Sequence, residues 1–245
     1  EIVCIQEHWL WEFQKNWFED NIENFQFLAR CHDSNENLSN FNIPRGRSGV
    51  AILWKNDISN KVSKLDVGNE RIVAVELNFD TKICLINVYM PTNKADSQYG
   101  YRECLDNLFD IIRRFETSHI IVLCGDLNGS LLQTRNNKHD IMLKDFVNEH
   151  CLSTGAHYTC QPTFYHFNGT VTSQIDYILT SNPEILKSYT VYDRQPENVS
   201  PHVPVGAELN ICAPVKSMDT RIQNMNSSKS TPRIAYSWRK LDQDK

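Results

Sequence analysis

Four short apolar runs, far apart in the chain, each carry a polar residue at or near their end. They cover residues 4–7, 87–91, 124–129 and 174–179, and present Glu7, Tyr89, Asp126 with Asn128, and Asp176. A fifth segment, residues 200–205, adds the imidazole of His202. One such run means little alone. Several in one chain predict strands whose ends converge on one pocket.

The apolar patterning predicts more strands than helices. Apolar residues recur at helical spacing over residues 99–116, residues 139–150 form a second plausible helix, and residues 10–20 form a short helix or an irregular segment. Strands are expected over residues 2–6, 49–54, 71–77, 82–89, 119–124, 174–180 and 204–211. Many of these strands are consecutive, so the class is α+β, or a β-sandwich flanked by helices.

The length of 245 residues suits one large domain with a tail. We expect the domain over residues 1–213 and a disordered linker or tail over residues 214–245, because that segment is rich in Ser, Asn and Lys. A net charge of −5 argues against a protein that coats nucleic acid, but it permits an enzyme with an acidic, metal-loaded centre.

The longest apolar run, residues 120–124, is far too short to cross a membrane, so no membrane partner is expected. None of the 8 cysteines forms a Cys-x-x-Cys pair, and those at 4, 84 and 124 lie within apolar runs. This pattern favours a reducing compartment inside the cell, either the cytoplasm or the nucleus.

Carboxylates and an amide of this kind are what metal-assisted phosphodiester cleavage requires. Glu7, just past an apolar run, suits a metal-binding carboxylate, although a solvated Glu at a strand end is the commoner case. Asp126 can accept a proton from an attacking water, and Asn128 can donate to a phosphate oxygen. In an extended segment the two would share one face, whereas an ordinary Asp/Asn-Gly turn is the alternative.

Asp176 and His202 form a natural acid–imidazole pair. Asp176 interrupts an apolar strand, so its carboxylate needs a partner, and a carboxylate bonded to one ring nitrogen fixes the imidazole tautomer. The alternative is a satisfied core Asp and a surface His. Tyr89 could bond a phosphate, although a tyrosine in this setting is more often a core aromatic. Arg45, Arg47, Arg135 and Lys138 lie in polar loops and could contact phosphates, although an exposed loop cation is the commoner case for each.

Together these segments resemble the endonuclease/exonuclease/phosphatase superfamily. The strongest likeness is to the apurinic/apyrimidinic-endonuclease-like domain at the front of LINE-type (non-LTR) retrotransposon polyproteins, over roughly residues 1–212. Residues 162–166 and 173–177 are similar to a late block of those elements. The resemblance implies a DNase I-like fold, a two-sheet β-sandwich flanked by helices, and hydrolysis of DNA phosphodiester bonds with Mg²⁺, or Mn²⁺ as an alternative.

The resemblance also implies a role for each site residue. Glu7 matches the metal-binding Glu and Tyr89 the phosphate-contacting Tyr. Asp126 matches the water-activating Asp and Asn128 its neighbour, while Asp176 matches the carboxylate that orients the catalytic His202. In such elements the nick exposes a 3′-hydroxyl that primes reverse transcription. The implied partners are therefore DNA and a reverse transcriptase downstream in the polyprotein.

Two departures from the family pattern matter. The family opens with a strand that carries a site Asn, and this sequence begins after it, so an open strand edge is expected. The late motif reads Ser200-Pro201-His202 where relatives have Ser-Asp-His. Because Pro supplies no carboxylate, we expect weaker metal binding or slower turnover. The alternatives are a phosphatase of the same superfamily that acts on an inositol phosphate or a sphingolipid, and a truncated copy without activity.

Overall fold

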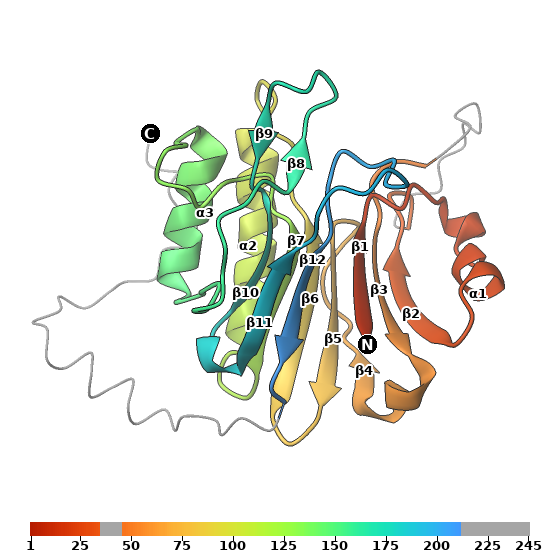
Figure 1. Ribbon diagram of the computed structural model, residues 1–245. Helices are drawn as coiled ribbons and strands as arrows, with labels where there is room; N and C mark the ends of the chain where they lie inside the picture. Colours follow the sequence, from red (N-terminus) through yellow and green to blue (C-terminus); the bar gives the residue numbers. More distant parts are fainter. Residues whose placement is uncertain (35–45, 212–245) are drawn as a thin grey trace, which may run out of the picture.

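Two β layers pack face to face, and helices lie against the outer faces of both (Figure 1). The computed structural model describes residues 1–34 and 46–211. One layer is a five-stranded sheet in the order β10-β7-β6-β5-β4, and the other holds a three-stranded sheet, β1-β3-β2, and the pair β11-β12. The α+β class and the helix-flanked β-sandwich are thus confirmed. The expected tail, residues 214–245, lies outside the described residues.

The helices of the described chain are α1 (Trp17–Asn21), α2 (Gln98–Phe115) and α3 (Lys138–Glu149), with 3₁₀ turns η1 (Glu12–Gln14), η2 (Asn56–Lys61) and η3 (Pro183–Ile185). The strands are β1 (Ile2–Gln6), β2 (Phe25–Arg30), β3 (Val50–Lys55), β4 (Val62–Lys64), β5 (Ile72–Asn78), β6 (Lys82–Tyr89), β7 (Ile120–Asp126), β8 (Phe164–Tyr165), β9 (Thr172–Ser173), β10 (Asp176–Thr180), β11 (Leu186–Val191) and β12 (Val205–Leu209).

Strand alternation places one core on each face of the five-stranded sheet. The five-stranded sheet is apolar on both faces, because successive side chains of a strand point to opposite sides. Ile86 of β6 packs toward α2 and α3, whereas its neighbour Leu85 packs toward β3 of the other sheet. Both side chains are buried, at 0% and 6% exposure. A continuous apolar run in β6 is therefore what a middle layer requires.

The pairing of β6 fixes the position of three strand ends. β5 pairs with β6 antiparallel, β6 with β7 parallel, and β7 with β10 antiparallel. The parallel pair needs a crossover, which α2 provides. In this register Tyr89 lies opposite Asp126, and Asp126 lies opposite Asp176. Residues from three separate runs of the sequence therefore stand side by side at one end of the sheet.

The buried amide of Asn87 joins the two layers. Its Nδ2 donates to the carbonyl oxygens of Ile5 on β1 and Ala51 on β3, at 2.9 Å each. Its Oδ1 accepts from Nε2 of Gln6 at 2.6 Å. Asn87 itself is 0% exposed. A fully bonded amide of this kind fixes how β1 sits on β6, and so where the residue after β1 lies.

β1 has the open edge that the sequence predicts. Within the described residues it pairs with β3 on one side only, through Ile2↔Trp54 to Gln6↔Val50. β12 likewise pairs with β11 alone. One edge of each strand thus keeps backbone groups that no other described strand takes up.

Several expected elements differ in extent from those observed. The strand expected over 119–124 continues to Asp126, and the expected 174–180 strand begins only at Asp176. Asp176 therefore opens its strand and does not interrupt it. The N–H groups of Ile175 and Asp176 donate to Oγ1 of Thr163, at 3.1 Å each, where a neighbouring strand would otherwise bond them. Strands β2, β4, β8, β9 and β11 were not among the strands expected from the sequence.

Candidate active site

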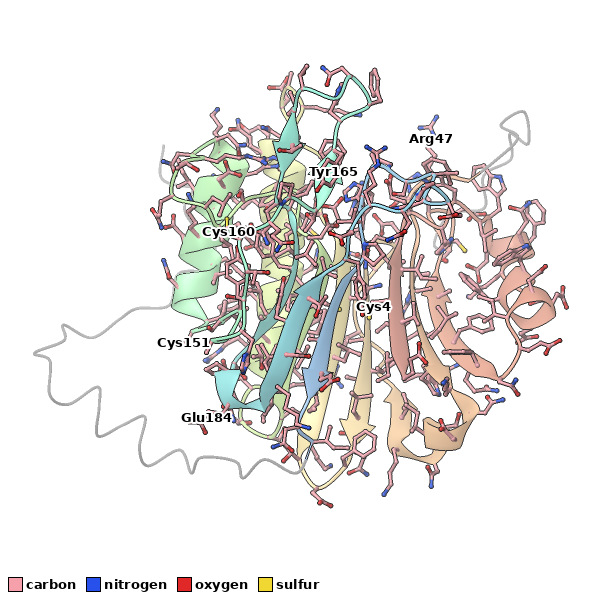
Figure 2. The ribbon with its side chains drawn as sticks, viewed as in Figure 1. Cys4, Arg47, Cys151, Cys160, Tyr165 and Glu184 are labelled. Carbon is pink, nitrogen blue, oxygen red and sulfur yellow. The ribbon has the colours of Figure 1, made fainter. Side chains whose placement is uncertain are left out.

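The site lies at the end of the molecule where β6 and β7 finish and the β8–β9 hairpin projects (Figure 1). Arg47 and Tyr165 lie toward this end and Glu184 toward the opposite one (Figure 2). Tyr89 ends β6, Asp126 ends β7, and Asp176 begins β10. The strand ends predicted to converge thus do so.

Gly125 sets the position of Asp126. Its φ is +134°, and a Cβ at this residue would lie 2.0 Å from the carbonyl oxygen of Val88. Only glycine allows β6 and β7 to approach this closely. Asp126 follows at 4% exposure, so its carboxylate is held against the end of β6 and not in a solvated loop.

Asn128 bonds Asp126 through a tight turn. Its backbone N–H donates to Oδ1 of Asp126 and its Nδ2 to Oδ2, both at 2.9 Å. The φ of Asn128 is +44°, so the backbone is not extended there. The expectation that Asp126 and Asn128 share one face of an extended segment is therefore wrong, and the alternative, a turn, is observed. Nδ2 also donates to the carbonyl of Met90 at 2.9 Å. The amide therefore orients the Asp126 carboxylate and has no spare Nδ2 proton for a phosphate in this arrangement.

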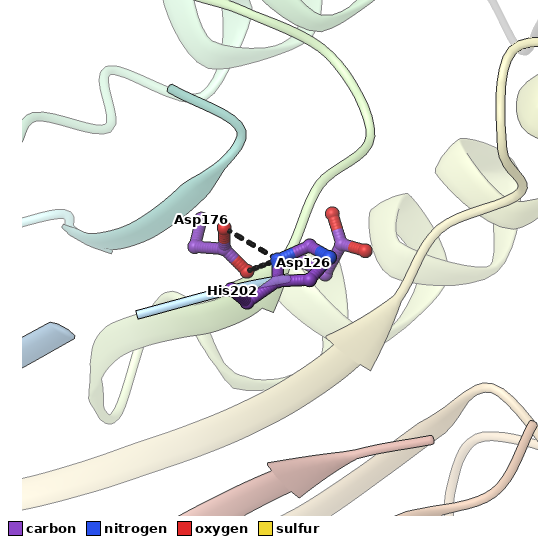
Figure 3. A group of neighbouring side chains, drawn as sticks. All are labelled: Asp126, Asp176 and His202. Carbon is purple, nitrogen blue, oxygen red and sulfur yellow. Dashed lines mark hydrogen bonds and ion pairs between the residues drawn. The ribbon is translucent and has the colours of Figure 1, made fainter. Parts of the chain in front are cut away.

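His202 and Asp176 form the expected acid–imidazole pair (Figure 3). Nδ1 of His202 lies 3.1 Å and 3.0 Å from the two carboxylate oxygens of Asp176. The edge of Phe164 meets the imidazole ring, with centroids 5.0 Å apart. The N–H of His202 donates to Oγ of Ser200 at 3.1 Å. Since Nδ1 faces the carboxylate, Nε2 is the ring nitrogen left to meet a substrate.

Glu7 and Tyr89 contact one another. The Tyr89 hydroxyl donates to Oε1 of Glu7 at 2.7 Å. Glu7 has a φ of +57° and is exposed, because the chain turns sharply as it leaves β1. Tyr89 is 8% exposed, so the ring belongs to the core while its hydroxyl reaches the site. Tyr89 is thus a core aromatic whose hydroxyl bonds Glu7, and its contact with a phosphate stays a prediction.

The charges of the site act on one another. Burial, followed by the charge of Asp176, raises the pKa of Asp126 to about 8. Burial alone would lower the pKa of His202, but the hydrogen bond and charge of Asp176, with the charges of Asp126 and Glu7, raise it above its ordinary value. Concentrated negative charge makes a site that favours a cation.

The donor set fits a divalent cation that prefers oxygen. One ligand atom each from Asp126, Asp176 and His202 lies within 4.8 Å of the others (Figure 3). Burial first, and then the charge of Asp176, raises the pKa of Asp126, so a cation held here would favour its ionised form. Glu7 adds its carboxylate from the Tyr89 side. Hard oxygen ligands of this kind suit Mg²⁺ or Mn²⁺.

Sequence reasoning missed two contributors. Thr163 is 0% exposed and holds the backbone at Asp176, and the carbonyl of Met90 holds Asn128. Arg135, one of the four loop cations considered, is paired with Asp140 at 3.1 Å. Arg45 lies outside the described residues. Backbone acceptors and buried hydroxyls leave no signature in a single sequence, so the first two had no signal to find.

Comparison with known proteins agrees with this geometry. The model of the endonuclease/exonuclease/phosphatase family matches residues 1–202. The chain belongs to this family. No curated protein sequence matches it.

Solved structures show the family fold at low sequence identity. A 3′ phosphatase from Neisseria, NExo, bound to a product DNA hairpin, is 18% identical with a TM-score of 0.65, over 85% of this chain and 88% of that one. The endonuclease domain of TRAS1, a telomere-specific non-LTR retrotransposon, is 14% identical with a TM-score of 0.61, over 86% and 87%. A family protein from Leptotrichia buccalis is 14% identical, with a TM-score of 0.58, over 86% and 87%.

Membership of the family makes this chain one of a group of phosphodiesterases, nucleases and phosphatases. Members are typically dependent on a divalent metal, which agrees with the Asp126, Asp176 and His202 group. No described helix has the length and apolar character needed to cross a membrane.

Proposed function

We propose that this family member is a Mg²⁺-dependent endonuclease that nicks DNA, and that the nick primes reverse transcription of a retrotransposon. The observation that carries the proposal is the group of Asp126, Asp176 and His202 at the converging strand ends. Likeness in sequence to LINE-type elements, and in fold to the TRAS1 endonuclease domain, supports the retrotransposon setting.

Each side chain has a distinct role in this proposal. Asp126, oriented by the Asn128 amide, accepts a proton from the attacking water. Asp176 holds Nδ1 of His202, so that the protonated ring presents Nε2–H to a phosphate oxygen. The bonded pair of Glu7 and Tyr89 lies beside them as metal ligand and phosphate contact. Bound Mg²⁺ supplies positive charge that stabilises both the phosphate oxygens and the ionised form of Asp126.

The decisive experiment is nicking of supercoiled plasmid with Mg²⁺ and with EDTA. The wild-type chain should nick only with the metal, whereas His202→Ala and Asp126→Ala should each lose activity by about 100-fold or more. His157→Ala, which alters an exposed histidine, is the matched control and should nick at the wild-type rate. Rates near wild type in folded His202→Ala protein would contradict the assignment.

The chemistry of the nick distinguishes the proposal from its alternatives. A nicking endonuclease should leave a 3′-hydroxyl that a polymerase extends directly. Release of inorganic phosphate from a 3′-phosphorylated oligonucleotide, or from an inositol phosphate, without plasmid nicking would identify a phosphatase. Folded protein that is inactive on all three substrates would identify a copy without catalytic function.

A further inference from the structure

Arg71 lies directly before β5 and covers the ring of Tyr89. Its guanidinium carbon is 5.3 Å from the ring centroid, and Nη1 donates to the Tyr89 carbonyl at 3.2 Å. The Tyr89 N–H in turn donates to the Arg71 carbonyl at 2.9 Å. The Arg71 N–H donates to Oδ1 of Asn69 at 2.9 Å. The position of Arg71 is therefore set by sheet pairing and by a turn, and not by the side chain alone.

Arg71 differs from three other described arginines in its lack of an acidic partner. Arg113 pairs with a glutamate at 2.7 Å, Arg135 with an aspartate at 3.1 Å, and Arg30 with an aspartate at 3.9 Å. Arg71 forms no ion pair with the carboxylates of the described chain. A half-buried cation that stays unpaired beside an acidic site is available for an anion from outside.

The electrostatics of the site create a need for such a cation. The carboxylates of Glu7 and Asp176 repel a polyanionic strand wherever a bound cation does not offset them. Guanidinium has five N–H donors in a planar fork that matches phosphate oxygens, and the structure shows one of these donors in use within the protein. The ring of Tyr89 holds the fork in place through its face.

We propose that Arg71 binds a backbone phosphate of the DNA strand beside the scissile one, with Tyr89 as the platform that orients its guanidinium. The inference rests on the proposed function, because it takes DNA as the substrate. It assigns to Arg71 a contact with substrate, as opposed to a brace that only holds Tyr89. The two roles differ in what they change: a phosphate contact changes binding and its salt dependence, whereas a brace changes turnover.

The test compares Arg71→Gln and Arg71→Lys with the wild-type chain. Gln retains a donor for the Tyr89 carbonyl and removes the charge, while Lys retains the charge. The matched control is Arg114→Ala, whose guanidinium also lies over an aromatic ring, that of Phe115 at 5.4 Å, but on α2. Circular dichroism establishes that each variant is folded.

For each variant we would measure kcat and KM of nicking and the slope of log K for DNA binding against log salt concentration. Arg71→Gln should raise KM about tenfold, with kcat within about twofold, and its salt slope should be shallower by about one. Arg71→Lys should keep the wild-type slope, and Arg114→Ala should match the wild-type chain throughout.

Two results would overturn the inference while leaving the proposed function intact. One is a wild-type salt slope and KM in Arg71→Gln, and the other is a fall in kcat alone, which marks a brace. A wild-type chain that neither binds nor nicks DNA would refute the proposed function and this inference together.

Discussion

Removal of the Asn87 side chain should loosen the contact between the two β layers. In Asn87→Ala, the carbonyls of Ile5 and Ala51 each lose a donor, and Gln6 loses its acceptor. The site is 0% exposed, so water cannot easily replace the amide. Because the same amide holds β1 against β6, the effect should reach the residue that follows β1.

The magnitude follows from the number of bonds lost. Three hydrogen bonds at about 1 kcal/mol net each give a loss of about 3 kcal/mol in the free energy of unfolding. For a chain of this size, that corresponds to a fall in Tm of about 6–12 °C. Nicking should also weaken at temperatures well below the new Tm, because Glu7 is carried by the strand that has lost its anchor.

Urea and thermal denaturation of Asn87→Ala measure the effect directly. Asn78→Ala is the matched control, since Asn78 ends the neighbouring strand β5 and is exposed. It should change the free energy of unfolding by less than about 0.5 kcal/mol. If Asn87→Ala is equally mild, the two sheets do not depend on this amide, and the reasoning from its burial is refuted.

Three further predictions concern single positions. Gly125→Ala would place a Cβ 2.0 Å from the Val88 carbonyl oxygen, so we expect a loss of more than about 3 kcal/mol in urea denaturation and displacement of Asp126. Burial, and then a nearby arginine, lower the pKa of His150 to about 4. Between pH 6.5 and pH 4 the unfolded chain therefore binds more protons than the folded one, and the free energy of unfolding decreases as the pH is lowered. In His150→Phe that fall, measured by urea at pH 7 and pH 4.5, should shrink by about 1–2 kcal/mol after allowance for partial exposure. Pro201→Asp should lower the Mg²⁺ concentration for half-maximal nicking, and an unchanged Mg²⁺ titration would show that a carboxylate there is immaterial.

The sequence predicted the strand ends because their signal is local. The apolar runs that end at Tyr89 and at Asp126 belong to strands of the middle layer, which buries both of its faces. The helices expected over 99–116 and 139–150 are observed as Gln98–Phe115 and Lys138–Glu149, since apolar spacing of this length is unambiguous.

What the sequence could not predict is long-range pairing. Arg71 and Tyr89 meet because β5 and β6 pair in one register, and Thr163 reaches Asp176 through its hydroxyl alone. Neither contact leaves a mark in residue order. The roles assigned to the site residues stay predictions until the nicking assays are made, whereas their positions are now known.

The contact of β1 with β6 also has a consequence for how the chain folds. The hydrogen bond that Tyr89 donates to Glu7 spans 82 positions in the sequence, and the one that Gln6 donates to Asn87 spans 81. Contacts between such distant positions form slowly, because the entropy of closing long loops is lost before the contacts form. On a ribosome, β1 must wait for β6 to emerge, and the imidazole of His202 arrives later still. The pair of Asp176 and His202 can thus form only after residue 202 has been made, so the candidate site is the last part of the described fold to be completed.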